Sequence, residues 1–262
     1  MELLMIMAVC FGSSVIGSIC GIGGGVIIKP VLDSVGIMEV TTASFLSGCT
    51  VLSMSAVSFF RNIGGERDYN FDKFFAGILT LGSVIGGVSG KAVFQNIVDG
   101  LDDKNAIGAI QAAILLIITA GTFIYTVNKK HVATKKIDSK STVFFLGLML
   151  GMMSSFLGIG GGPMNLIVLY YFFSMETKEA ALYSICIIMF SQLSALFSTL
   201  ISGQTPKFSA GILALMVGCG VFGGIAGTKI NNRVTNKAVD KLFVGLIVVI
   251  MLLSVYNIVR YA

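Results

Sequence analysis

Charged residues are scarce in this chain, since Lys, Arg, Asp and Glu make up 12% of its 262 residues, against about 25% in soluble proteins. Hydrophobic residues make up 55% and form long uncharged runs. Runs of ~20 such residues are long enough to cross a bilayer as a helix. The composition therefore indicates an integral membrane protein with about six to eight membrane segments. It excludes a soluble enzyme, a nucleic-acid-binding module and a disordered chain.

The chain has a single histidine, His131, which lies in the most basic loop. This excludes a metal site built from several histidines and argues against the Ser–His dyad of an intramembrane protease. The five cysteines form no CxxC pair and all lie in apolar runs, so we expect buried thiols rather than a disulfide or zinc framework. The sequence thus predicts no catalytic residue, no metal and no cofactor.

Two of the apolar runs are too long for one straight helix. They have about 30 residues, or ~45 Å as helix, against a hydrocarbon core of ~30 Å. Each contains the same glycine string, at 21–25 (GIGGG) and at 158–162 (GIGGG). We therefore expect two half-helices joined by a turn in each. The runs are 3–32, 41–60, 74–98, 105–127, 142–174, 179–202, 208–230 and 238–259.

The chain contains an internal duplication. The two glycine strings lie 158 − 21 = 137 residues apart, and sliding the sequence by that offset keeps matching residues without a gap. Polar residues match in the same register, for example Ser47 with Ser184 and Glu39 with Glu176. We expect a first membrane repeat at 1–128, a basic linker at 129–141 and a second membrane repeat at 142–262.

The positions of Lys and Arg predict the orientation. If both glycine-broken segments are re-entrant hairpins, most loop Lys and Arg residues, including those of the 129–140 loop, lie on one side of the membrane. That side should be the cytoplasm, with both termini outside and the halves inverted. If all eight segments cross fully, in a four-plus-four arrangement, the basic residues divide almost evenly. We therefore expect an all-α protein of two inverted repeats, each one re-entrant hairpin plus three transmembrane helices. The basic loop residues are Lys129, Lys130, Lys135, Lys136 and Lys140.

The glycine strings are the first candidates for a binding site. A glycine break before a helix exposes backbone N–H groups at an N-terminus that carries about half a positive charge and favours anions. Two hairpins entering from opposite sides would bring two such ends together, as in inverted-repeat transporters. Alternatively, the glycines only permit close helix packing. The expected anion-binding glycines are Gly21, Gly23, Gly24, Gly25, Gly158, Gly160, Gly161 and Gly162.

Polar residues beside these strings are further candidates. Lys29 lies one helical turn past Gly25, where it either attracts the anion or snorkels to an interface. Asn165 has amide donors at a similar depth in the second string, with a packing role as the alternative. Ser47 and Ser184 occupy the same repeat position on serine stripes that either line a path or hold helices together. The first stripe consists of Ser44, Ser47, Ser55 and Ser58.

Two further patterns concern packing and energy. Gly82, Gly86 and Gly90 form a GxxxGxxxG motif, typical of close helix contact. Each Asp and Glu lies near the end of an apolar run or in a loop, so we expect no proton relay through buried carboxylates. An inside-negative potential alone contributes ~2.3 kcal/mol per charge per 100 mV to anion export.

These motifs resemble the sulfite exporter TauE/SafE family of bacterial and archaeal permeases. That family has a GxGGG string near the start of each half, followed by an apolar stretch and a proline. Pro30 fits in the first half; in the second, Ile167 takes the proline position and Pro163 comes earlier. The resemblance implies a transporter of small, often sulfur-containing anions such as sulfite, thiosulfate or sulfonates.

The combined prediction is a multi-pass permease of the cell inner membrane that exposes an anion site alternately to each side. The expected partners are a small anionic substrate and membrane lipid, without nucleic acid, and a homo-oligomer is left open. The alternatives are an anion channel and a non-transporting membrane scaffold.

Overall fold

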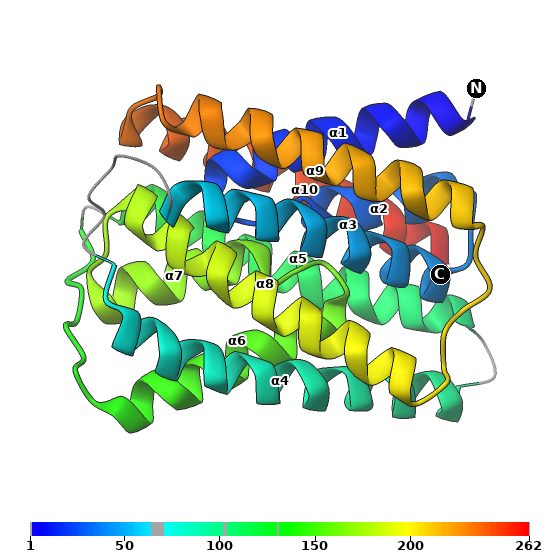
Figure 1. The fold of residues 1–262 in the computed structure, drawn as a ribbon, viewed down its shortest axis with the longest axis horizontal. Coiled ribbons are helices and arrows are strands. Elements are labelled where there is room, and N and C mark those ends of the chain that lie inside the picture. The colour runs from blue at the N-terminus through cyan, green and yellow to red at the C-terminus, as the bar shows by residue number, and fades with distance from the viewer. Residues whose placement is uncertain (1, 64–70, 102–103, 130, 262) are drawn as a thin grey trace.

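The computed structural model describes residues 2–63, 71–101, 104–129 and 131–261. These residues form ten α-helices and no strand (Figure 1). Eight of the helices are long and apolar enough to cross a membrane, whereas α2 and α7 have 11 and 12 residues. The prediction of an all-α polytopic membrane protein is confirmed. The helices are α1 (Glu2–Cys20), α2 (Gly25–Val35), α3 (Val40–Ile63), α4 (Lys73–Gly100), α5 (Lys104–Asn128), α6 (Lys140–Leu157), α7 (Gly162–Phe173), α8 (Thr177–Ile201), α9 (Ala210–Asn231) and α10 (Asn236–Tyr261).

Both long apolar runs break at their glycines, as predicted, but only the second limb of each is a half-helix, because α1 and α6 have 19 and 18 residues and are long enough to cross a membrane. Helix α1 ends at Cys20 and α2 begins at Gly25, and α6 and α7 are separated in the same way. At 1.5 Å per residue α2 is ~16 Å long, about half of a hydrocarbon core. It turns back beside α1, toward the end of the bundle where α1 begins (Figure 1). Pro163 stands in the first turn of α7, where its missing N–H costs nothing.

The bundle has two ends. At the linker end, which holds residues 131–139, the Lys129 ammonium donates to the Asp240 carboxylate at 2.6 Å. At the termini end, Arg260 donates to the backbone carbonyl of Asp33 at 2.6 Å, and both chain ends lie there (Figure 1). Lys130, part of the predicted basic loop, lies outside the described residues. Which end faces the cytoplasm stays a prediction.

Glycine contacts join the two halves. A side-chain carbon on Gly90 of α4 would collide with the Met152 carbonyl of α6, and one on Gly227 of α9 would collide with the Val15 carbonyl of α1. Both residues of the second contact lie at the 137-residue offset from those of the first. The prediction that these glycines serve close packing is confirmed. Helix α4 of the first half thus packs on α6 of the second, and α9 of the second half packs on α1 of the first. The two halves are therefore joined by two equivalent helix contacts.

Candidate functional site

The two glycine turns, residues 21–24 and 158–161, lie against each other inside the bundle. A Cβ placed on Gly25 would lie 2.6 Å from the carbonyl oxygen of Ile159. A Cβ on Gly162 would lie 3.3 Å from the carbonyl oxygen of Ile22. Gly25 and Ile22 in the first half correspond to Gly162 and Ile159 in the second. The contacts are therefore reciprocal, as a two-fold relation between equivalent surfaces requires.

Val51 and Ile188 cover this contact from α3 and α8. A Cβ on Gly23 would lie 3.5 Å from Val51 Cγ1 and 3.4 Å from Ile188 Cδ1. A Cβ on Gly160 would lie 2.8 Å from Val51 Cγ1 and 3.3 Å from Ile188 Cγ2. Both glycines have positive φ, +76° and +82°, which residues with a side chain rarely adopt. Glycine is thus required there for conformation as well as for space.

The outer glycine of each turn has a different neighbour. Gly21 packs directly on Ala181 of α8, where a side-chain carbon would collide. Gly158 packs on Ser44 of α3, whose Oγ would lie 3.1 Å from a Cβ at that glycine. Ser44 and Ala181 are equivalent positions, so the surroundings of the first turn are apolar and those of the second are polar.

Each turn leads into a helix N-terminus without a side-chain cap. The N-cap residues Gly24 and Gly161 have no side chain, and no side-chain cap is formed at either among the described residues. Ile27 and Ile28 of α2 already donate to the Gly24 carbonyl, and Pro163 of α7 has no N–H. The N–H groups of the first residues, Gly25 and Gly162, are therefore left at the positive end of each helix dipole. Asn165 lies in the first turn of α7 and is fully buried. Its Oδ1 would lie 2.9 Å from a Cβ on Gly161, and neither amide atom has a hydrogen-bond partner among the described residues.

Ser47 and Ser184 are both fully buried, and neither hydroxyl has a partner in the described part of the chain. Ser47 lies one helical turn before Val51, and Ser184 one turn before Ile188. Because α3 and α8 run in opposite directions (Figure 1), the two serines lie on opposite sides of the glycine contact. The structure therefore places them as flanking groups rather than as one pair. In contrast, Ser58 bonds Ser18 at 2.7 Å and so holds helices together.

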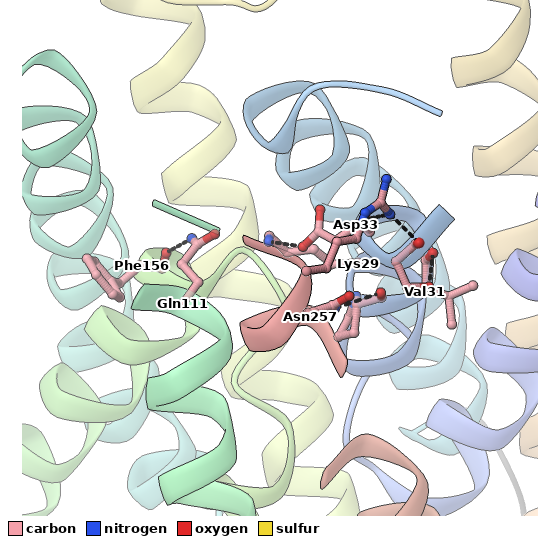
Figure 2. A network of polar contacts seen from close by, with 9 residues as sticks. Lys29, Val31, Asp33, Gln111, Phe156 and Asn257 are labelled. Carbon is pink, nitrogen blue, oxygen red and sulfur yellow. Dashed lines mark hydrogen bonds and ion pairs between the residues drawn. The ribbon is translucent and has the colours of Figure 1, made fainter. Parts of the chain in front are cut away.

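Lys29 is buried and already neutralised. Its ammonium lies 2.6 Å from Asp33 Oδ2, one turn further along α2, and the side chains are 3% and 5% exposed (Figure 2). Lys29 therefore does not snorkel, and its charge is compensated by a carboxylate. Asp33 directly follows the first apolar run, as the sequence shows, but it is a buried carboxylate because α10 and α5 cover the end of α2.

A polar network around this ion pair tethers α2 (Figure 2). Asn257 of α10 donates to the Pro30 carbonyl at 2.9 Å, and Gln111 of α5 donates to the Phe156 carbonyl at 2.7 Å. Both side chains and the ion pair line a cavity of about 10 Å³, room for about one water molecule. Sequence reasoning missed Asp33, Gln111 and Asn257. The four-residue spacing of Lys29 and Asp33, which places both side chains on one helix face, was the one sequence signal for their ion pair.

Comparison with known proteins identifies the family. No curated protein and no solved structure matches the chain. The family model described as "Sulfite exporter TauE/SafE" matches residues 6–254, which takes in both glycine turns and all ten helices at least in part. This is a family of membrane transporters for sulfur anions. The chain belongs to the TauE/SafE sulfite exporter family.

Proposed function

We propose that this protein carries a small sulfur-containing oxyanion, such as sulfite, thiosulfate or a sulfonate, across the cell membrane by alternating access at the paired glycine turns. The observation that carries the proposal is the reciprocal contact of the two turns under Val51 and Ile188. An anion there would receive backbone N–H groups from two uncapped half-helices. Asn165, Ser47 and Ser184 would add donors, because their buried polar atoms have no partner among the described residues.

The energetics of the site favour an anion. A buried N–H or hydroxyl without a partner costs about 1–3 kcal/mol, and an oxyanion supplies acceptors to several donors at once. In the non-polar interior these charge-assisted bonds are roughly twice as strong as neutral ones. Lys29 is not required for charge in this scheme, since Asp33 already compensates it. Its role is to hold α2, and with it the first glycine turn.

The same arrangement suggests how the site changes sides. Each turn belongs to a helix pair that returns to its own end of the bundle, so rocking one half against the other would open one end at a time. With the linker end in the cytoplasm, the inside-negative potential drives a monovalent anion outward by ~2.3 kcal/mol per 100 mV. Export without a coupling ion is therefore the direction we propose.

Flux in proteoliposomes tests the function. Vesicles holding the purified protein are loaded with sulfite, thiosulfate, sulfate or a sulfonate, and efflux is recorded with and without an imposed potassium-diffusion potential. We expect saturable efflux of at least one sulfur anion that accelerates as the interior becomes more negative. Non-saturating conductance would indicate the channel alternative. Absence of flux for all four anions, from protein shown to be folded, would favour the scaffold and contradict the proposal.

A further inference from the structure

A second polar cavity borders the second glycine turn. It is lined by Gly158, by Ser44 of α3, Ser155 of α6 and Gln192 of α8, and by Lys91 of α4. Its volume is about 20 Å³, room for one or two water molecules. Side chains from four helices therefore meet here, next to the turn that is already a candidate for anion binding.

Two hydroxyls in this cavity have no partner. Ser44 and Ser155 are 6% and 5% exposed, and neither Oγ forms a hydrogen bond with any described residue. Ser44 Oγ lies over the turn, 3.1 Å from the position of a Cβ on Gly158. Buried hydroxyls are normally paired, so each unpaired one points to a ligand or water.

The equivalent place beside the first glycine turn is closed by its own hydrogen bonds. There Ser18, the counterpart of Ser155 at the 137-residue offset, bonds Ser58 Oγ at 2.7 Å and Thr228 Oγ1 at 3.1 Å. All three side chains are fully or almost fully buried. These three hydroxyls thus satisfy one another, and none of them is left without a partner for a ligand.

Beside the second glycine turn both partners are replaced. Ala195 stands where Ser58 does, and Lys91 stands where Thr228 does. The Lys91 ammonium lies 4.7 Å from the centre of the Phe94 ring, and it pairs with no carboxylate among the described residues. The hydroxyl network found beside the first turn is therefore replaced, beside the second turn, by a lysine and a serine hydroxyl that has no partner among the described residues.

We propose that Lys91, Ser44 and Ser155 form a subsite for a small oxyanion next to the second glycine turn. Lys91 supplies the positive charge that Lys29 does not, and the two hydroxyls supply donors around the anion oxygens. The Gln192 amide, whose Nε2 already donates to Ser154 Oγ at 3.2 Å, has one further N–H to add. The inference rests on the proposed function, because it names the charged group at that same site. The cavity is smaller than sulfite, so Lys91 and its neighbours move outward when the anion enters.

Binding of radiolabelled sulfite to the full-length protein in lipid nanodiscs tests the subsite. We expect Lys91→Gln to weaken binding about 10- to 100-fold, because a hydrogen bond to a charged group is lost, whereas Lys91→Arg stays within a few fold of wild type. Ser155→Ala and Ser44→Ala should each weaken it about 5-fold. Lys207→Gln is the matched control, since it removes an exposed lysine near the same end of the bundle and leaves the cavity intact. Thermal unfolding of every variant checks that it is folded.

The outcomes separate this inference from the proposed function. If wild-type protein transports sulfite and Lys91→Gln binds it unchanged, the subsite is wrong and the transport function stands. An equal loss in Lys207→Gln also overturns the subsite, because it indicates attraction by surface charge only. Nanodiscs with and without phosphatidylglycerol distinguish the source of the oxyanion. If Lys91→Gln loses bound anionic lipid but not sulfite, Lys91 binds a lipid phosphate and the inference fails. If wild-type protein neither binds nor transports sulfur anions, both proposals fail.

Discussion

Val51 and Ile188, which occupy the same position in the two halves, both pack against Gly23 and Gly160. The closest approach would be 2.8 Å, between Val51 Cγ1 and a Cβ on Gly160. Each residue therefore closes the turn of its own half and that of the other half. In the proposed mechanism an anion would reach the backbone N–H groups only after α3 or α8 moves away, so these two side chains would link access to the motion of the halves.

The fit of the two turns makes Gly25 sensitive to a single methyl group. It has no positive φ, so Gly25→Ala tests space alone, and its Cβ would lie 2.6 Å from the Ile159 carbonyl oxygen and 2.7 Å from Val51 Cγ2. We expect ~1–3 kcal/mol of destabilisation from overpacking and at least a tenfold loss of sulfite flux. Gly162 has a φ of +37°, so Gly162→Ala adds backbone strain to the steric clash and should cost at least as much. Gly12→Ala is the control, since a Cβ there meets nothing within 4 Å; if it loses as much flux, the turn contact is not special.

Removal of the flanking hydroxyls should separate stability from transport. Ser47 and Ser184 are buried without a partner among the described residues, so alanine removes an unsatisfied group and leaves unfolding temperature unchanged or raised. If the hydroxyls bind the anion, KM for sulfite rises about 5-fold in each variant. Thr119→Val is a suitable control, because that hydroxyl is bonded to the Leu115 carbonyl of its own helix. An unchanged KM in both serine variants would assign them to helix packing.

The Lys29–Asp33 ion pair should be structural. Removing one partner leaves a buried charge, so Lys29→Gln or Asp33→Asn should cost ~3–5 kcal/mol, whereas Lys29→Met with Asp33→Leu should recover most of it. We expect the double variant to retain sulfite affinity, measured together with thermal unfolding. A double variant that is stable but has lost sulfite affinity would indicate that Lys29 binds the anion.

Orientation can be checked with single cysteines at the two ends. Lys136 and Gln204 are both exposed, at the linker and termini ends respectively. Since positive loops stay in the cytoplasm, an impermeant thiol reagent should label Gln204→Cys in intact cells and Lys136→Cys only after lysis. Wild-type protein, with its five native cysteines, gives the background. The reverse pattern would invert the proposed topology.

The helices and the two breaks could be predicted because they depend on local sequence. The apolar runs predicted the helices, and the two GIGGG strings predicted the turns between α1 and α2 and between α6 and α7. The repeat offset of 137 residues also predicted which residues correspond, and the contacts of Gly25 and Gly162 follow it.

Partners from distant segments could not be predicted. Lys29 was expected near an anion, but its nearest charge is Asp33 and its cover comes from α5 and α10, more than 80 residues away in sequence. Ser47 and Ser184 match in the repeat, but the opposite directions of α3 and α8 place them apart. Lys91 attracted no attention in the sequence because its significance depends on Ser155 and Ser44, which lie on other helices.

Counterflow of labelled sulfite tests the central claim, an anion carrier that alternates, most directly. Proteoliposomes are loaded with unlabelled sulfite and diluted into a trace of labelled sulfite, with the membrane potential clamped at zero. The account predicts a transient accumulation of label inside the vesicles above the outside concentration, present in wild type and in Gly12→Ala and lost in Gly25→Ala. Entry of label without any overshoot, or an overshoot that Gly25→Ala retains in full, would contradict alternating access at the glycine turns.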